Sequence, residues 1–146
     1  MARRIALVVV LLGAAAAASA QDAAYKVIVN ASNPTATAKR AAIAQLFMSR
    51  SVSWAWGPGA DPVDQSMTSP IRDAFSREVL GMPLAAVQNY WRKRLLDTHE
   101  VPPLVKASDA EVIGYVAKNP GAVGYVAAAT DLPPAVKALK ISDPIH

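Results

Sequence analysis

The stretch NPGAVGYV, Asn119–Val126, decides the fold class of this 146-residue chain. Its first three residues form turns readily, and the apolar run Ala122–Val126 that follows is typical of a strand. Upstream, Ser108 and Glu111 have the spacing of a capping box at the start of a helix. The sequence therefore predicts a helix that ends near Asn119, then a tight turn, then a strand.

Further elements are expected on the N-terminal side of this unit. The run YKVIV, Tyr25–Val29, ends at the turn-forming residues NASNP and predicts the first strand. An amphipathic helix capped by Thr37 or a neighbouring residue follows. Its apolar face comprises Ala42, Ile43, Leu46 and Phe47. A loop rich in glycine and proline then carries Trp54 and Trp56, which are expected to cover the core, and Pro62–Asp64 is expected to be extended.

The middle of the chain is expected to be mainly helical. Apolar residues recur at helical spacing from Pro70, and Gly81 is a typical stop signal, which predicts a helix over Pro70–Leu80. Another helix opens at Pro83. Its predicted buried stripe consists of Leu84, Val87, Trp91 and Leu95, while Gln88, Arg92 and Lys93 face solvent. The proline-containing segment DTHEVPPLV, 97–105, is expected to be a loop.

The order of these elements predicts an α/β fold, in which helices pack on a small mixed sheet. The run VKALKI near the C-terminus adds a closing strand or helix, and the sequence leaves both open. The tail SDPIH that follows it is expected to be frayed.

The first twenty residues have the features of a secretory signal peptide. Arg3 and Arg4 precede a long apolar run, which ends in the small-residue triplet 18–20 with an A-x-A pattern. A membrane anchor is the alternative, but the strongly apolar part is shorter than the ~20 residues of a spanning helix. We therefore expect residues 1–20 to be cleaved and residues 21–146 to form a single soluble domain, periplasmic or secreted.

Composition limits the partners of that domain. The chain has no cysteine, so a lipoprotein-type signal is excluded and packing alone must hold the exported domain. Without Arg3 and Arg4 of the leader, 13 basic residues stand against 11 acidic ones, a net charge of +2. This balance argues against a nucleic-acid partner, whose binding needs a basic patch.

The stretch SMTSPIRDAF, Ser66–Phe75, is the candidate functional motif. Ser69 is a favourable N-cap and Pro70 a favourable first helical residue, so the start of a helix explains both. Arg72 is different, because a cation in the first turn faces the positive end of the helix dipole. Its charge therefore needs a negative partner.

Two explanations of Arg72 are open. The carboxylate of Asp64 or Asp73 can neutralise it within the protein. Alternatively, the helix N-terminus binds a small oxyanion, as such termini do readily. The predicted ligand-binding residues are then Ser66, Thr68, Ser69 and Arg72.

Enzymatic and metal-binding functions have little support. A triad of Ser69, His99 and an aspartate lacks the G-x-S-x-G elbow around its serine. His99 has no second histidine at ligand spacing, and His146 lies in the tail. There is no phosphate-cradling G-x-x-x-x-G-K loop. We expect no catalysis, no cofactor and no metal.

Several segments together resemble one lobe of the phosphate-binding proteins of ABC transporters, in the periplasmic binding-protein-like (type 2) superfamily. They are VIVNASNP, AQLFMSRSVSWAWG, SPIRDAFSREVLG, YWRKRLL and NPGAVGYV, and they span nearly all of Tyr25–Val126. The resemblance implies a single lobe of a fold whose full-length members hold a solute between two lobes. It also implies a Ser-Gly-Thr turn that contacts phosphate. Ser69 and Pro70 occupy its place here, without the glycine and the threonine.

Two functions follow from this resemblance. The first is an exported solute-binding-type protein for phosphate or another small oxyanion, with its site completed by a second copy or by a membrane transporter. The alternative is a non-catalytic periplasmic interaction module that kept the fold but lost solute binding. The altered turn favours the second function, whereas Arg72 favours the first.

Overall fold

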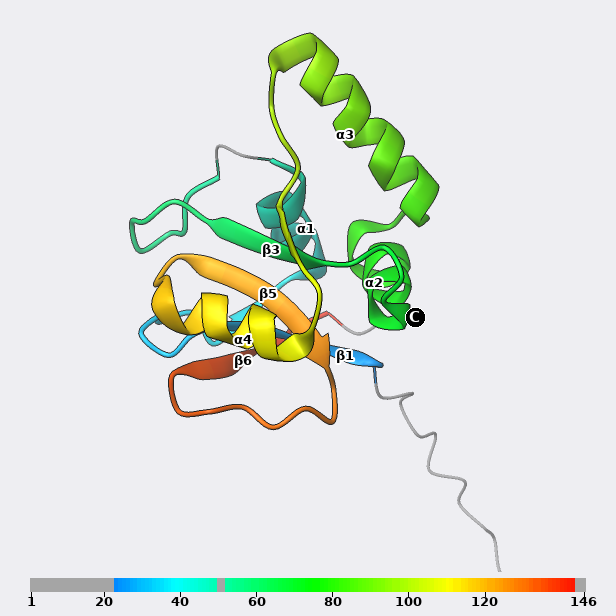
Figure 1. The fold of residues 1–146 in the computed structure, drawn as a ribbon. Helices are drawn as coiled ribbons and strands as arrows, with labels where there is room; N and C mark the ends of the chain where they lie inside the picture. Colours follow the sequence, from blue (N-terminus) through cyan, green and yellow to red (C-terminus); the bar gives the residue numbers. More distant parts are fainter. Residues whose placement is uncertain (1–22, 50–51, 144–146) are drawn as a thin grey trace, which may run out of the picture.

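The computed structural model describes residues 23–49 and 52–143 (Figure 1), so the predicted signal peptide lies outside the described residues. The elements in chain order are β1 (Tyr25–Asn30), β2 (Thr37–Ala38), α1 (Arg40–Met48), β3 (Asp61–Gln65), α2 (Pro70–Phe75), the π-helix η1 (Ser76–Leu80), α3 (Leu84–Thr98), β4 (Leu104–Lys106), α4 (Asp109–Lys118), β5 (Ala122–Ala127) and β6 (Val136–Ile141).

A six-stranded mixed sheet forms the centre of the fold, in the order β2-β6-β1-β5-β3-β4. Strand β1 is antiparallel to both β5 and β6, whereas β3 is parallel to both β5 and β4. The predicted α/β fold with a small mixed sheet is confirmed. The run VKALKI, for which strand and helix were open, is a strand because it pairs with β1.

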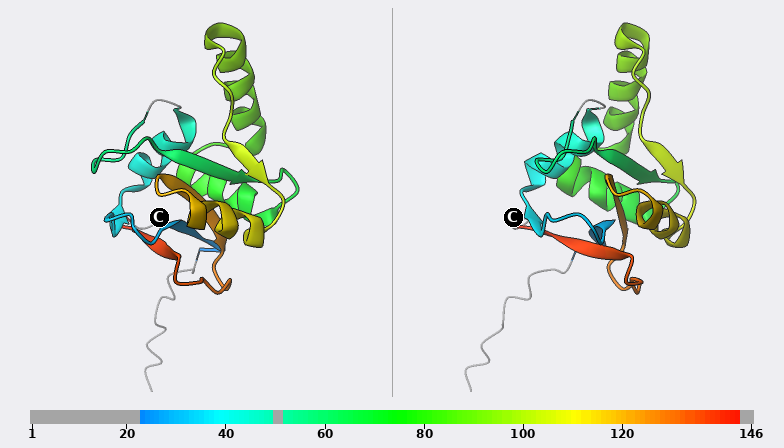
Figure 2. Two further views of the ribbon diagram at one scale, coloured as in Figure 1. Left: turned by 60° about the vertical axis from the view of Figure 1, so that its left-hand side comes forward. Right: turned by 90° about the vertical axis from the view of Figure 1, so that its left-hand side faces the viewer.

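Helices cover both faces of the sheet, and Figure 2 shows α1 and α4 on opposite sides. One core cluster joins α1, α2 and η1 to the sheet through Phe47, Phe75 and Tyr125, among others. The second cluster joins α4 to the other face through Val112 and Val116. Because alternate residues of a strand point to opposite faces, residues 27–29 of β1 and Ala122–Ala127 of β5, which are covered on both faces, are apolar.

The unit α4–β5 follows the sequence prediction closely. The Ser108 hydroxyl accepts a hydrogen bond from the Glu111 amide at 3.2 Å, and the Glu111 carboxylate accepts one from the Ala107 amide. Gly124 of β5 lies directly beneath α4, where a Cβ atom would come within 2.7 Å of a Val112 methyl group. The glycine therefore allows α4 to approach the sheet.

The predicted helix over Pro70–Leu80 is also confirmed, as α2 followed without a break by η1. It stops at Gly81, whose φ of 71° lies in the left-handed region that glycine adopts without strain. Ser69 stands at the N-cap position and Pro70 at the first helical position, as predicted, although the Ser69 side chain makes no capping hydrogen bond.

Thr37, the residue named as the cap of α1, does not cap the helix. Thr37 pairs in parallel with β6, and the helix begins at Arg40, after Lys39. Its N-terminus is capped by Asp143, whose carboxylate accepts a hydrogen bond from the Arg40 amide at 2.6 Å. The cap therefore comes from the other end of the chain, from a segment that was expected to fray. Ile43, Leu46 and Phe47 are buried as predicted, but Ala42 is exposed.

The segment around α3 differs from the predictions at two points, and the tryptophan loop before β3 differs at one. Val87 and Trp91 are buried, but Leu95 is 44% exposed, because the C-terminal half of α3 projects from the body (Figure 1). Leu104 and Val105, expected in a loop, belong to β4, whose three residues pair on one side with β3. Of the two loop tryptophans, Trp54 is buried as predicted, and Trp56 is exposed.

Candidate functional site

The three hydroxyl residues of the candidate motif lie between β3 and α2. Ser66 and Thr68 are close together, with 3.0 Å between their hydroxyl oxygens, and this pair is exposed. The Ser69 hydroxyl turns back toward the sheet and donates to the side-chain carbonyl of Gln65 at 3.0 Å. The motif therefore presents one outward-facing hydroxyl pair and one inward-facing hydroxyl.

Arg72 is buried, and its charge has a partner within the protein. Its Nη2 atom lies 3.2 Å from Oδ2 of Asp64, and its Nη1 atom donates to the backbone carbonyl of Gln65 at 2.8 Å. Of the two carboxylates proposed from the sequence, Asp64 pairs with Arg72, whereas Asp73 pairs with Arg77 one helical turn later. The cation in the first turn of α2 is therefore compensated.

Gln65 is the centre of a wider polar network at the C-terminal end of β3. Its side-chain amide donates to Asp109 at 2.8 Å and to the carbonyl of Tyr125 at 2.9 Å. Burial tends to raise the pKa of Asp109, but hydrogen bonds from Thr130, Gln65 and the Ala127 amide outweigh it and hold the pKa below its ordinary value. The network thus ties the candidate motif to α4 and β5.

Tyr125 connects this network to the apolar core. Its hydroxyl donates to Asp64, and its ring stacks on Phe75 with 4.0 Å between the centroids. Burial, together with the negative charge of Asp64, raises the pKa of Tyr125 well above its ordinary value. The phenol therefore remains a hydrogen-bond donor to the carboxylate, which helps to orient Asp64 toward Arg72.

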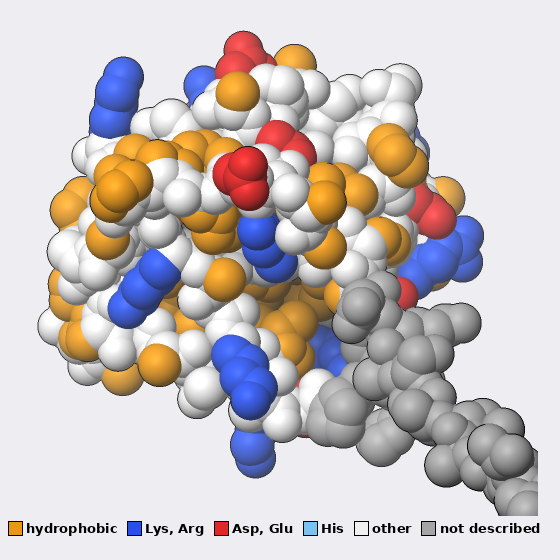
Figure 3. Space-filling model, turned by 90° about the horizontal axis from the view of Figure 1, so that it is seen from below, with side chains coloured by type: hydrophobic (Ala, Val, Ile, Leu, Met, Phe, Trp, Pro, Cys, Tyr) orange, Lys and Arg blue, Asp and Glu red, His pale blue; other side chains and the backbone are white. Residues whose placement is uncertain are grey.

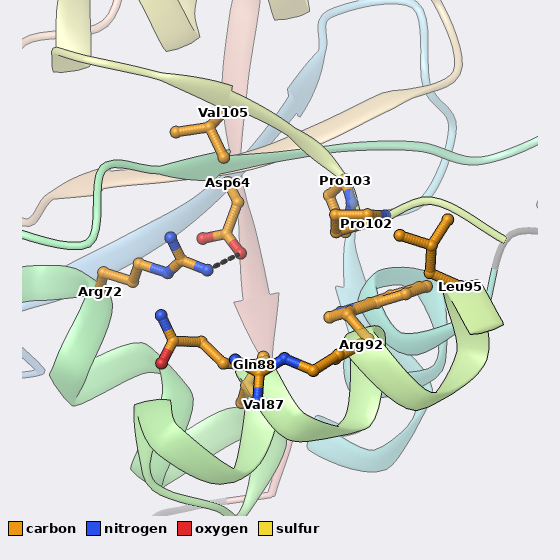
Figure 4. Close-up of a pocket in the computed structure, with 10 residues that line it drawn as sticks. Asp64, Arg72, Val87, Gln88, Arg92, Leu95, Pro102, Pro103 and Val105 are labelled. Atoms are coloured by element: carbon orange, nitrogen blue, oxygen red, sulfur yellow. Dashed lines mark ion pairs between the residues drawn. The ribbon is translucent and has the colours of Figure 1, made fainter.

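The Asp64–Arg72 pair forms one wall of a pocket of about 370 Å³ (Figure 4). Side chains of α3 and of the segment that leads into β4 form the other walls. The lining residues are Asp64, Arg72, Val87, Gln88, Trp91, Arg92, Leu95, Pro102, Pro103 and Val105. Ser66, Thr68 and Ser69 do not line this pocket, although Met67 contacts Gln88 at its edge.

Several of these residues were not identified as site residues from the sequence. Gln88 and Arg92 were assigned to a solvated helix face, and they do lie at the surface, but they also border the pocket. Pro102 and Pro103 were assigned to a loop. The sequence signal that could have identified them is the pair Pro102 and Pro103, which follows the apolar stripe of α3. This signal does not show that the proline segment and α3 face each other.

Several solved structures share this fold. A phosphate ABC transporter substrate-binding protein from Clostridium perfringens, solved with bound phosphate, matches 81% of this chain with a TM-score of 0.63 and 19% identity. An ABC-type phosphate transport receptor from Vibrio cholerae matches 83% with a TM-score of 0.62 and 20% identity. PstS from Borrelia burgdorferi matches 84% with a TM-score of 0.61 and 14% identity. The chain therefore has the same fold as the matched part of each of these proteins.

The single lobe spans 44–49% of these three structures, less than half of each. None of their names describes an enzyme. No family model and no curated protein matches the chain. The resemblance proposed from the sequence is confirmed at the level of the fold.

The face of the molecule in Figure 3 agrees with the charge balance of the sequence. On the face in Figure 3, lysine and arginine side chains are dispersed among neutral, apolar and acidic ones rather than gathered in one patch. Within residues 23–49 and 52–143, no three potential metal ligands come together. None of the described helices combines the length and the apolar character that crossing a membrane requires.

Proposed function

We propose that the protein is an exported solute-binding-type lobe that binds phosphate or a similar small oxyanion at the start of α2. The observation that carries this proposal is the shared fold with two proteins named for phosphate transport, one of them solved with bound phosphate. The leader-like residues 1–20 support export to the periplasm or beyond.

The chemistry at the start of α2 is compatible with an oxyanion. The exposed hydroxyls of Ser66 and Thr68 can both donate, and each can rotate toward a bound oxygen. Arg72 has five N–H donors; its Nη2 atom contacts Asp64 and its Nη1 atom donates to Gln65. Ser69 already donates its single hydroxyl hydrogen to Gln65, so it joins the site only by giving up that bond, and Pro70 contributes no amide. Such a site is shallow, and a second copy or a transporter subunit would cover it.

A second candidate function is that of a periplasmic interaction module. The observation that favours it is the projecting C-terminal half of α3, on which Leu95 and Leu96 are 44% and 74% exposed. Exposed apolar residues that gather on one element commonly mark a contact with another protein. This function does not require an oxyanion.

Thermal unfolding in the presence of anions separates the two functions. A ligand that binds only the folded state raises the melting temperature by mass action. We expect phosphate to raise it more than chloride at equal ionic strength, with sulfate measured in parallel because excluded salts stabilise proteins without a site. The rise should be lost in a Ser66→Ala/Thr68→Ala variant. An equal response of wild type and variant to all three anions would eliminate the oxyanion site.

A further inference from the structure

We propose that the pocket between α3 and β4 binds an extended peptide segment that carries an apolar side chain and, two residues along, a carboxylate. This site is separate from the exposed hydroxyl pair at the start of α2, and its occupant is a segment of another protein. Four features of the pocket support the assignment: its apolar walls, its charge, the free edge of β4 and its apolar rim.

The pocket has apolar walls on two sides. Val87, Trp91 and Leu95 face it from α3. Pro102, Pro103 and Val105 face it from the opposite side (Figure 4). Its volume of about 370 Å³ falls within the range of sites for small ligands and side chains. A large aliphatic side chain therefore fits between the two walls.

The charge of the pocket is positive by one unit. Asp64 and Arg72 neutralise each other at its wall. Arg92, at the α3 side, donates to the neutral Asn89 side chain at 3.3 Å, and no carboxylate among the described residues forms an ion pair with it. An occupant with one negative charge near Arg92 is therefore complementary.

The free edge of β4 adds a contact that suits a peptide backbone. The Ser66 amide donates to the Lys106 carbonyl, and β4 runs parallel to β3. In a parallel ladder alternate residues bond to the neighbouring strand, so the N–H and C=O of Val105 point away from β3. The Val105 side chain meanwhile lines the pocket. A peptide that pairs with Val105 therefore runs alongside the pocket.

This edge is too short for a long backbone ladder. Pro102 and Pro103 have no N–H group, and the Ala107 amide is already bonded to Glu111. Side chains in the pocket must therefore supply most of the affinity and the specificity. In an extended peptide, residues two positions apart point to the same face and lie ~7 Å from each other, which allows one to enter the pocket while the other reaches its rim.

The apolar rim continues beyond the pocket. Leu96 is 74% exposed on α3, and Val101 is 50% exposed on the segment that returns along it. The C-terminal half of α3, which carries Leu96, projects from the body in Figure 1. A macromolecular partner covers such a rim, whereas a small solute leaves it in water.

The test is a calorimetric titration of the purified protein with the peptide acetyl-Thr-Leu-Thr-Glu-Thr-amide. Two matched peptides replace the leucine by threonine or the glutamate by glutamine. We expect saturable binding of the first peptide, about tenfold weaker binding without the leucine, and two- to fivefold weaker binding without the glutamate, because an exposed ion pair contributes little.

Variants of the protein identify the site. Leu95→Ser should weaken the binding of the first peptide about tenfold. Arg92→Gln should weaken the binding of this peptide two- to fivefold. The same substitution should remove the preference for the peptide with glutamate over the peptide with glutamine. Lys93→Gln is the matched control, because Lys93 lies next to Arg92 on α3 but does not line the pocket. Arg92 and Lys93 are exposed, and Leu95 is 44% exposed. All three variants should therefore fold.

The outcomes are distinct from those for the oxyanion site. Ser66→Ala/Thr68→Ala should leave peptide binding unchanged, and Arg92→Gln should leave the phosphate response unchanged. The absence of saturable peptide binding at millimolar concentration overturns the proposal. Equal affinities of the three peptides, or equal effects of Arg92→Gln and Lys93→Gln, overturn it as well.

Discussion

Replacement of Arg72 by methionine should lower the free energy of unfolding by about 3 kcal/mol. Removing one partner of a buried ion pair typically costs about 3–5 kcal/mol, because the other charge remains buried without compensation. The side chains of Arg72 and Asp64 are 11% and 7% exposed, and the pocket beside them admits water. Asp64 also keeps the hydroxyl donor of Tyr125. These two features place the cost at the lower end of the range.

Urea denaturation followed by circular dichroism measures this cost. Arg77→Met is the matched control, because the same change breaks the exposed pair with Asp73, whose side chains are 61% and 49% exposed. It should cost below about 0.5 kcal/mol. A double variant, Asp64→Asn/Arg72→Met, should recover about 1 kcal/mol relative to Arg72→Met, because no unpaired charge remains. Equal costs for Arg72→Met and Arg77→Met would refute the buried pair.

Three further predictions concern packing, pH and export. Gly124→Ala should destabilise the protein by about 1–3 kcal/mol, because the new methyl group meets Val112, and a chemical melt with less than about 0.5 kcal/mol of loss would contradict the close approach of α4. The pKa of Asp109 is lowered in the folded protein, so its contribution to stability is present above the ordinary aspartate pKa of about 3.9 and is lost as the pH falls below it. The stability difference between wild type and Asp109→Asn, measured by urea melts from pH 7 to pH 3, should therefore shrink toward acid, and a constant difference would argue against this role. Intact-mass measurement of exported protein should give a chain that starts at Gln21, and a secreted form that retains Leu11 would refute cleavage there.

Elements with local signals were predictable from the sequence. The capping pair Ser108 and Glu111, the stop at Gly81 and the apolar run of β5 each specify their own structure within a few residues. Local hydrogen bonds and backbone preferences decide such features, so they can be inferred without the fold.

Features that depend on distant segments were not predictable. The start of α1 is set by Asp143 and by the pairing of Thr37 with β6, both from the far end of the described chain. The exposure of Leu95 depends on where α3 leaves the body, which its helical periodicity does not encode. In both cases the tertiary arrangement, and not the local sequence pattern, decides the outcome.

The candidate site lies between these two cases. The sequence showed that Arg72 needs a negative partner and offered Asp64, Asp73 or a bound oxyanion. It could not select Asp64, because that choice depends on how β3 and α2 pack. The pocket lies between α3 and the segment Pro102–Val105. The sequence of neither segment shows that the two lie opposite each other.

The central claim, oxyanion binding at the start of α2, is tested most directly by calorimetric titration with inorganic phosphate. Arg72 is unsuitable for this test, because its replacement should also destabilise the fold. The exposed hydroxyls of Ser66 and Thr68 can be removed with little effect on packing. The account predicts saturable phosphate binding to the wild type and to Arg77→Met, and at least tenfold weaker binding to Ser66→Ala/Thr68→Ala. Absence of saturable binding to the wild type, or equal affinity in all three proteins, would contradict it.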